Sequence, residues 1–551
     1  MYSVMGRPLL TWAAFIVYVA VIITVIFFIM QSTPSTAVIP NQAPANQFSA
    51  ERVYEDLKSF AQKPRHPGTE YHEEAKNYII NTIRMMDIPV MIESSTVMHE
   101  GKELPIQNIV ATVEGSEPGK TTMMMAHYDS VEEGPGVNDD AVNVGVILEV
   151  MRVLKQEKQL KNTITFLITD GEEAGLYGAM EYVKKHTMDN IGVVVNLEAR
   201  GFKGPILLYQ TIGPSGKAIQ LFNEHVESPY AFSFLSDLYT ILPHDTDLTA
   251  FNNNGVIGLN LAYIEGAGVY HTQKDDLNHV DLPTVQNMGE HAVSIIKAFG
   301  AYDLTTLSNE EDQAFFNLVG KKLIVYPVSW NYALTAIALL LGAAAVLYGI
   351  NKKIVHLRKS IRWSLFVVTC TILLYIFGTF FYIAFSIYEF QGIAGALLIF
   401  LAIAAILICL MIWVLKKLKT MTRMKRLAKG LSVIDIIVGA MLIMAILTVM
   451  TTFFLPGSHY LTAIPLALCS ISLLGYLLLS RFVLASMILS ILTAVPLTLL
   501  LYPALRLLFI GFGVQGSHYL LIILCLFVPL AIPAFMNLEA KPLESNANNI
   551  N

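Results

Sequence analysis

The sequence predicts an α/β domain, built on a mixed, mostly parallel sheet flanked by helices, joined to a polytopic α-helical transmembrane domain. Two observations favour this fold class. The 551 residues are 54% hydrophobic and only 15% charged, which is too apolar for a soluble enzyme of this size. The apolar residues are also unevenly spread, because runs long enough to cross a bilayer, about 20 residues each, flank one stretch of mixed composition.

The first apolar run, Leu9–Met30, has the length of a membrane helix and lacks a convincing cleavage site, so we expect an uncleaved anchor. Cleavage near Ala37 is the alternative. We divide the chain into the anchor (1–33), a linker (34–50), a mixed domain (51–305), a juxtamembrane segment (306–331), about seven membrane helices (332–536) and a polar tail (537–551). The expected spans are Tyr332–Ile350, Trp363–Tyr388, Ile393–Leu415, Leu431–Leu455, Tyr460–Leu479, Phe482–Leu505 and His518–Phe535.

The distribution of charge and cysteine predicts orientation and compartment. Lysines and arginines gather in the loops at 352–362 and 416–429, and positive loops stay in the cytoplasm. We therefore expect the mixed domain outside the cytoplasm and the C-terminus inside it. All 4 cysteines lie in predicted spans, and the mixed domain has no Asn-x-Ser/Thr sequon, which favours a prokaryotic cell membrane. The small net charge of −6 indicates no nucleic-acid partner.

Within the mixed domain, apolar β-rich runs alternate with helical patterns. We predict strands at Asn108–Val113, Thr121–Ala126, Thr163–Thr169, Ile191–Leu197 and Val256–Ala262, and helices at Val142–Leu154, Ala174–Lys185 and Leu282–Tyr302. Strands that alternate with helices of this length are typical of a mostly parallel sheet with helices on its faces.

Histidines and carboxylates recur where these strands end. The segments AHYDSVEEGPGVNDD, TDGEEAG, NLEARG and VYHTQKDD each overlap or follow the end of a predicted strand. Strand ends are where α/β proteins place ligands and chemistry. Two imidazoles and several carboxylates without a thiolate suit zinc or a similar divalent ion. The candidate metal ligands are His127, Asp139, Glu173, Glu198 and His271.

One catalytic metal needs only three protein ligands, so the surplus indicates two metals. We predict that Asp139 bridges them, with His127 and Glu198 on one ion and Glu173 and His271 on the other.

Two further acidic residues receive supporting roles. Asp129 is expected to accept a hydrogen bond from the second ring nitrogen of His127 and so fix its tautomer. Glu172 stands beside a ligand without being one, which makes it the predicted general base for a metal-activated water. Two adjacent glutamates are also ordinary at a helix N-terminus, and that explanation is compatible with the catalytic one.

The segments AHYDS, GVNDD, DGEEAGLYGA, NLEARG and YHT resemble the co-catalytic zinc aminopeptidases of metallopeptidase family 28, over Glu51–Pro327. The resemblance implies a zinc exopeptidase-like fold, two zinc ions on the five ligands above, and Glu172 as general base. It also implies that Tyr270 polarises the tetrahedral intermediate, with simple packing as the alternative. Glu198, where many members have aspartate, is similar to the membrane-bound branch of the endoplasmic-reticulum metallopeptidase and vacuolar membrane protease type.

The sequence therefore predicts a hydrolase: a membrane-embedded zinc-dependent exopeptidase acting on peptide substrates outside the cytoplasm. Aminopeptidase action follows from the resemblance alone, and cobalt or manganese could occupy the same ligands. The alternatives are a non-catalytic scaffold, which the complete ligand set disfavours, and a transport protein, which the scarcity of ionisable residues in the spans disfavours. The complete set also disfavours a single-zinc glutaminyl cyclase. The sequence assigns no residue to substrate binding. His244 in the segment PHDTD leaves the substrate specificity open, and the oligomeric state is also left open.

Overall fold

The computed structural model describes residues 6–31, 36–242, 244–252, 254–309, 311–318, 322–369, 371–373, 375–376, 379, 432–479 and 483–512. The chain forms two compact units. The sheet unit comprises Ser32–Trp330 together with Leu455–Ser458, and the membrane unit comprises Met1–Gln31, Asn331–Phe454 and His459–Asn551.

The sheet unit is built on an eight-stranded sheet with the order β1-β2-β4-β3-β5-β8-β6-β7. The strands are β1 (Val90–His99), β2 (Lys102–Val113), β3 (Thr121–His127), β4 (Ile164–Thr169), β5 (Ile191–Ala199), β6 (Leu207–Ile212), β7 (Tyr230–Ala231) and β8 (Ile257–Tyr263). The pairs β4/β3, β3/β5, β5/β8 and β6/β7 are parallel, and β1/β2, β2/β4 and β6/β8 are antiparallel. The predicted mixed, mostly parallel sheet is therefore confirmed.

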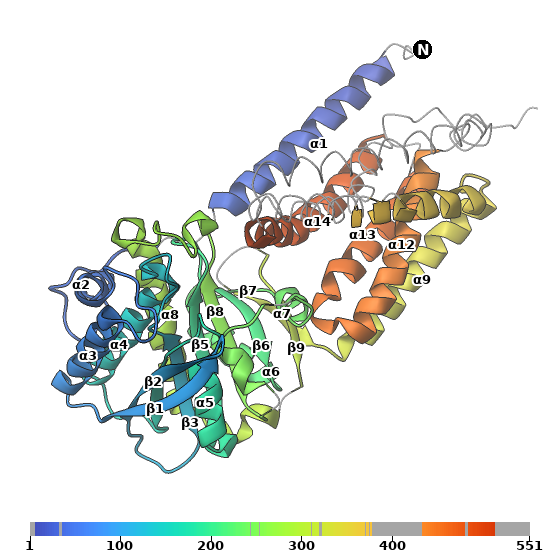
Figure 1. Cartoon of the computed structure of the whole chain (residues 1–551). Coiled ribbons are helices and arrows are strands. Elements are labelled where there is room, and N and C mark those ends of the chain that lie inside the picture. The colour runs from blue at the N-terminus through green and yellow to red at the C-terminus, as the bar shows by residue number, and fades with distance from the viewer. Residues whose placement is uncertain are drawn as a thin grey trace, which may run out of the picture. The chain divides into compact units, whose positions relative to one another are not determined.

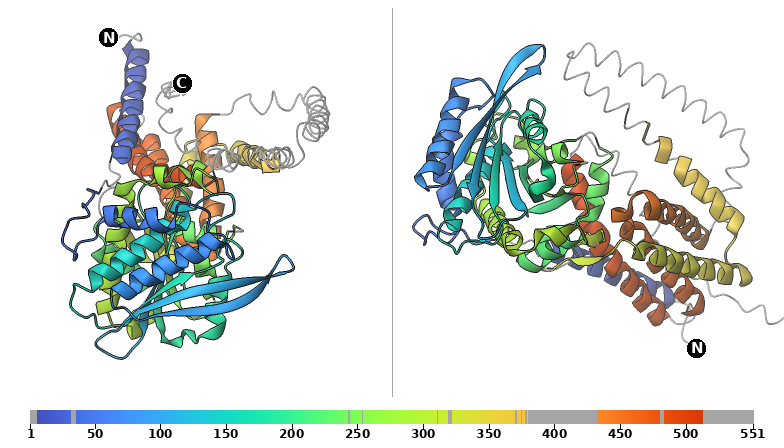
Figure 2. Two further views of the ribbon diagram at one scale, coloured as in Figure 1. Left: turned by 60° about the vertical axis from the view of Figure 1, so that its left-hand side comes forward. Right: turned by 90° about the horizontal axis from the view of Figure 1, so that it is seen from below.

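Helices cover both faces of this sheet (Figures 1 and 2). The first face packs against α2 (Ala50–Phe60), α3 (Glu70–Met85), α4 (Val142–Leu154), α6 (Gly216–His225) and α8 (Leu282–Ala301). The second packs against α5 (Tyr177–Lys185) and η3 (Asp247–Phe251). Because side chains alternate along a strand, β3 contributes Met124 to the first core and Met123 and Met125 to the second. Both faces of the central strands are thus buried, which holds their ends rigidly.

The helices begin where the sequence offers a capping side chain. Ser49, Thr69 and Asp281 each accept a hydrogen bond from the backbone N–H three residues later, at the start of α2, α3 and α8. The remaining helix of this unit, α7 (Ser233–Tyr239), lies beside the loop Leu455–Ser458, since the hydroxyl of Ser233 donates a hydrogen bond to the carbonyl of Gly457.

Two predicted elements of this unit have other bounds in the structure, and the strands β1, β6 and β7 were not predicted. The helix expected at Ala174–Lys185 begins only at Tyr177, because Gly175 and Leu176 have φ angles of 135° and 60°, which no helix contains. The strand expected at Asn108–Val113 is the second half of the longer β2, which forms a hairpin with β1. Much of β1 is exposed, so its residues lack the apolar run that marks a buried strand.

The described part of the membrane unit consists of long apolar helices. They are α1 (Gly6–Gln31), α9 (Trp330–Asn351), α12 (Val433–Phe454), α13 (Tyr460–Leu479) and α14 (Val483–Phe512). Among the described residues, four stretches are long and apolar enough to cross a membrane, at 330–351, 434–454, 456–479 and 491–511, and each overlaps a predicted span. The predicted spans Ile393–Leu415 and His518–Phe535 lie outside the described residues, and Trp363–Tyr388 is described only in part.

Candidate metal centre

The central parallel strands deliver the candidate ligands to one edge of the sheet. His127 ends β3, Glu198 is the penultimate residue of β5, Glu173 follows β4, and His271 follows β8. The carboxyl ends of parallel strands lie at the same edge, so these side chains converge there. Asp139 reaches the same place from η1 (Val137–Ala141), a short turn directly before α4.

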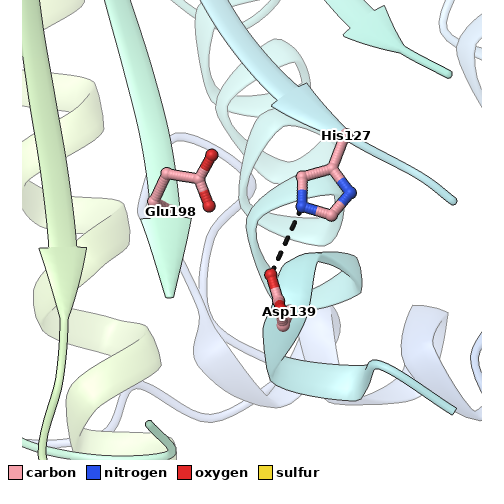
Figure 3. Close-up of side chains that lie close together, drawn as sticks. All are labelled: His127, Asp139 and Glu198. Carbon is pink, nitrogen blue, oxygen red and sulfur yellow. Dashed lines mark ion pairs between the residues drawn. The ribbon is translucent and has the colours of Figure 1, made fainter. Parts of the chain in front are cut away.

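Two groups of donor atoms lie close enough to hold a metal ion each, and both include Asp139. The first is His127, Asp139 and Glu198 (Figure 3), and the second is Asp139, Glu173 and His271, with the atoms of each group within 4.8 Å of one another. Oδ1 of Asp139 lies 3.3 Å from Nε2 of His127, and Oδ2 lies 3.2 Å from Nε2 of His271. Nε2 of His271 is also 3.0 Å from Oε2 of Glu173. Asp139 therefore directs one carboxylate oxygen to each group.

The mutual proximity of these charges shifts their pKa values in opposite directions. Burial alone would raise the pKa of Asp139, but His127 and His271 lower it to about 2. Burial and the negative charge of Asp139 raise the pKa of Glu173 to about 7. Burial, and again the charge of Asp139, raise the pKa of Glu198 to about 8 although His127 opposes this. The cluster thus holds more negative charge than its own residues neutralise, which favours a bound cation.

A second observation indicates that these donor atoms fit a divalent metal ion. Nε2 of His127, on the side of Asp139, and Oε1 of Glu173 are buried and have no hydrogen-bond partner among the described residues. Burying a polar atom without a partner costs about 1–3 kcal/mol, so such atoms need a ligand. Nitrogen and carboxylate oxygen donors are those that zinc takes in catalytic sites.

Asp129 contacts one residue of each group of donor atoms. It is fully buried, and its Oδ1 lies 3.4 Å from Nδ1 of His127. Its two carboxylate oxygens also accept hydrogen bonds of 3.1 Å from the backbone N–H groups of Glu172 and Glu173. One carboxylate therefore positions a ligand on β3 and the segment that follows β4.

The side chains of Glu172 and Tyr270 border this centre. Burial and the charges of Glu198 and Asp247 raise the pKa of Glu172 well above its usual value. The backbone N–H of Glu172 donates a hydrogen bond to Asp129, which holds this residue beside the candidate ligands. The ring of Tyr270 stacks on that of His271, with centroids 3.8 Å apart. Burial and four neighbouring carboxylates raise the pKa of Tyr270, so it keeps its proton.

Two residues that support the candidate ligands were not predicted from the sequence. The carboxylate of Asp275 accepts hydrogen bonds from the backbone N–H groups of Asn138 (2.8 Å) and Asp139 (3.1 Å), and from the Asn138 side chain (2.7 Å). Arg65 is fully buried and donates to the carbonyls of Tyr128 and Gly136. Asp275 stands four residues after His271, so its charge beside a ligand was a usable signal, whereas Arg65 belongs to no motif.

A chain of amides supports the ligand on β5. The Asn196 side chain donates to Oε1 of Glu198 (3.2 Å) and to the amide oxygen of Asn260 (3.1 Å). The Asn260 side chain in turn donates to Gln210 and to Thr246. Asn196 and Asn260 are direct partners in the register of β5 and β8, so sheet pairing brings them together.

Glycines let the loop between β3 and η1 close on its neighbours. A Cβ on Gly134 would overlap the carbonyl of Thr272, next to His271. Gly136 has a φ of 58°, and a Cβ there would overlap the backbone oxygen of Asp139. Larger residues at these two positions would displace the segments that carry the candidate ligands His271 and Asp139.

The family model described as "Peptidase family M28" matches residues 108–296. The chain is 30% identical to endoplasmic reticulum metallopeptidase 1 of Rattus norvegicus over 231 residues, covering 40% of this chain and 26% of that protein. It is 25% identical to the vacuolar membrane protease of Candida dubliniensis over 317 residues, covering 54% of this chain and 34% of that protein. The match therefore spans about a third or less of these relatives.

Solved structures are also similar to part of this chain. A Porphyromonas gingivalis glutaminyl cyclase matches with 20% identity and a TM-score of 0.39, covering 46% of this chain and 99% of that one. An aminopeptidase from Aneurinibacillus sp. strain AM-1 matches with 14% identity and a TM-score of 0.39, covering 46% of this chain and 94% of that one.

Proposed function

Because the chain carries a domain of peptidase family M28, we propose that it is a membrane-embedded zinc exopeptidase that removes N-terminal residues from peptides. The observation that carries this proposal is the position of Asp139, whose two carboxylate oxygens face the two groups of donor atoms. A residue placed in this way is suited to bridge two metal ions.

In this proposal His127, Asp139 and Glu198 would hold one zinc ion, and Asp139, Glu173 and His271 would hold the other. When bound, such ions lower the pKa of a water molecule and polarise a carbonyl.

The protein side chains then move the protons. The pKa of Glu172, raised by burial and neighbouring carboxylates, favours uptake of a proton from the attacking water. The same proton can be passed to the amine that leaves. Tyr270 retains its hydroxyl proton and can donate a hydrogen bond to the oxyanion of the intermediate. Asp129 keeps His127 oriented and fixes the backbone of Glu172, so that ligand and base hold a constant separation.

The proposal also assigns the location of the peptidase domain. The basic loops at 352–362 and 416–429 favour a domain outside the cytoplasm, and the four apolar helices support a lipid bilayer as the surroundings of the membrane unit. The absence of sequons and of cysteines from the sequence of the domain favours a prokaryotic cell membrane.

The test compares the purified full chain with Glu172→Gln and a control, Glu132→Gln. The control changes an acid whose side chain is 73% exposed, so it should affect neither metal nor rate. Bound metal is quantified, and hydrolysis is followed on aminoacyl reporter substrates and on N-terminally blocked peptides. We expect about two zinc ions in all three proteins. We also expect cleavage of unblocked substrates by the parent and the control, and a loss of about 100-fold or more in kcat for Glu172→Gln.

Other results would change the assignment. One zinc ion per chain would remove the bridging role of Asp139. Cleavage of blocked peptides would remove the aminopeptidase assignment. Full metal content without hydrolysis of any substrate would favour a non-catalytic scaffold.

A further inference from the structure

Arg200 is a cation at the edge of the candidate metal centre, two residues beyond Glu198. Its backbone N–H donates to the carbonyl of Tyr263, which fixes the chain just past the end of β5. Its side chain is exposed, and among the described residues it forms no salt bridge with any carboxylate. This is unusual beside so many acidic groups, and it leaves the guanidinium free for a ligand.

Two neighbours place the guanidinium close to the candidate metal centre. Its central carbon lies 5.5 Å from the centroid of the Tyr270 ring, and that ring stacks on His271. His244 is close enough to interact electrostatically with Arg200, because burial and then the positive charge of Arg200 hold the pKa of His244 below its usual value. Arg200 is therefore bordered by a residue next to a candidate ligand and by the loop before η3.

We propose that Arg200 binds a carboxylate of the peptide substrate, so that the enzyme prefers peptides that carry a negative charge close to the scissile bond. This inference rests on the proposed function and names its substrate class.

The chemistry of the group supports this assignment. A guanidinium presents a planar fork of donors that matches a carboxylate, and such charge-assisted hydrogen bonds are stronger than neutral ones. The ring of Tyr270 holds the guanidinium of Arg200 by a cation–π contact, so the side chain loses less conformational entropy when it binds a carboxylate. Three of the five candidate ligands, and Glu172, are acidic, so they favour the amine end of a peptide, while Arg200 places a cation beside Tyr270, the residue before a candidate ligand.

Two kinds of substrate offer such a carboxylate, the free C-terminus of a dipeptide and an acidic side chain after the scissile bond. Both are tested with four substrates that share one N-terminal residue, chosen from the reporter panel above. The first pair is the dipeptide with C-terminal glycine and its amide. The second pair carries aspartate or asparagine in place of glycine, with the C-terminus amidated in both.

The assay uses the zinc-loaded full chain, Arg200→Gln, Arg200→Lys and a matched control, Lys203→Gln. Lys203 is also an exposed cation over an aromatic ring, 5.1 Å from the centroid of Phe202, and it lies three residues away. We expect the parent to cleave the charged member of one pair with a kcat/KM about tenfold above its neutral partner, a value reduced by the exposure of the site. Arg200→Gln should abolish this ratio and leave the neutral substrates within about twofold, Arg200→Lys should retain part of it, and Lys203→Gln should retain all of it.

The pair that shows the preference identifies the source of the carboxylate. Equal cleavage of charged and neutral substrates by the parent would overturn the inference and leave the proposed function intact. So would a loss in Arg200→Gln that is the same for all four substrates, since it would indicate a general structural role. Failure of the parent to cleave any unblocked substrate would overturn both the inference and the proposed function.

Discussion

Replacing Asp275 with asparagine removes a charge that holds the backbone at Asp139 without changing the size of the side chain. Oδ1 of Asp275 accepts two of the three hydrogen bonds, both from Asn138, and Oδ2 accepts the third, from the N–H of Asp139. If the amide oxygen of asparagine takes the Oδ1 position, its NH2 group faces the N–H of Asp139. Two donors then point at one another, and the third hydrogen bond is lost.

The size of the effect follows from the kind of bond. A hydrogen bond to a charged acceptor contributes about 1.5–3 kcal/mol, and burial of Asp275 at 2% exposure leaves little room for water to replace it. If the metal-bound state requires Asp139 in place, this loss appears in metal affinity. We therefore expect the Kd for zinc to rise by about 10- to 100-fold.

The measurement is a competition titration of zinc between the protein and a fluorescent chelator. Asp276→Asn is the matched control, because the side chain of Asp276 is 33% exposed and its contacts are with Asn278 and His279 in the short turn η5 (Leu277–His279). A Kd for Asp275→Asn within twofold of the control would refute the reasoning. The backbone of Asp139 would then be held by other contacts.

Three further predictions concern the same centre. Gly134→Ala should lower zinc content and kcat together, because its Cβ meets the backbone of Thr272; equal metal content in variant and parent would count against this. Arg65→Met should destabilise the sheet unit by about 3–5 kcal/mol, since it leaves buried carboxylates uncompensated, and pulse proteolysis across a urea series measures this. In the metal-free protein Glu173 and Glu198 have pKa values raised from 4.5 to about 7 and about 8. Their protons stabilise the fold below pH 4.5, and this contribution is lost as the pH rises through those values, so excess zinc should raise the Tm more at pH 8 than at pH 6.

The part of the fold that the sequence could predict is the part with local signals. The strands β3, β4, β5 and β8 are apolar runs bounded by turn residues, and the ends of β3 and β5 carry His127 and Glu198. Because parallel strands align their carboxyl ends, the order of these segments was enough to predict that the five candidate ligands converge. The late start of α5, after Leu176, was not predictable in this way, because a positive φ in leucine has no sequence signature.

The supporting residues depend on contacts between distant segments. Arginine is ordinarily a surface residue, so nothing in the sequence around Arg65 indicates that its guanidinium is buried against the loop after β3. The pair Asn196 and Asn260 depends on the exact register of β5 and β8, which composition does not specify. Sequence patterns thus indicated which residues carry the chemistry, and only the tertiary structure showed what positions them.

The candidate ligands come from segments spread along most of the sheet unit, from His127 to His271, and the sequence of this unit contains no cysteine. Metal ions bound there would act as cross-links between β3, β5 and the segments after β4 and β8, as disulfides do in secreted domains. A chain released or cut before His271 would lack one of the ligands, so hydrolytic activity would begin only when the sheet is complete.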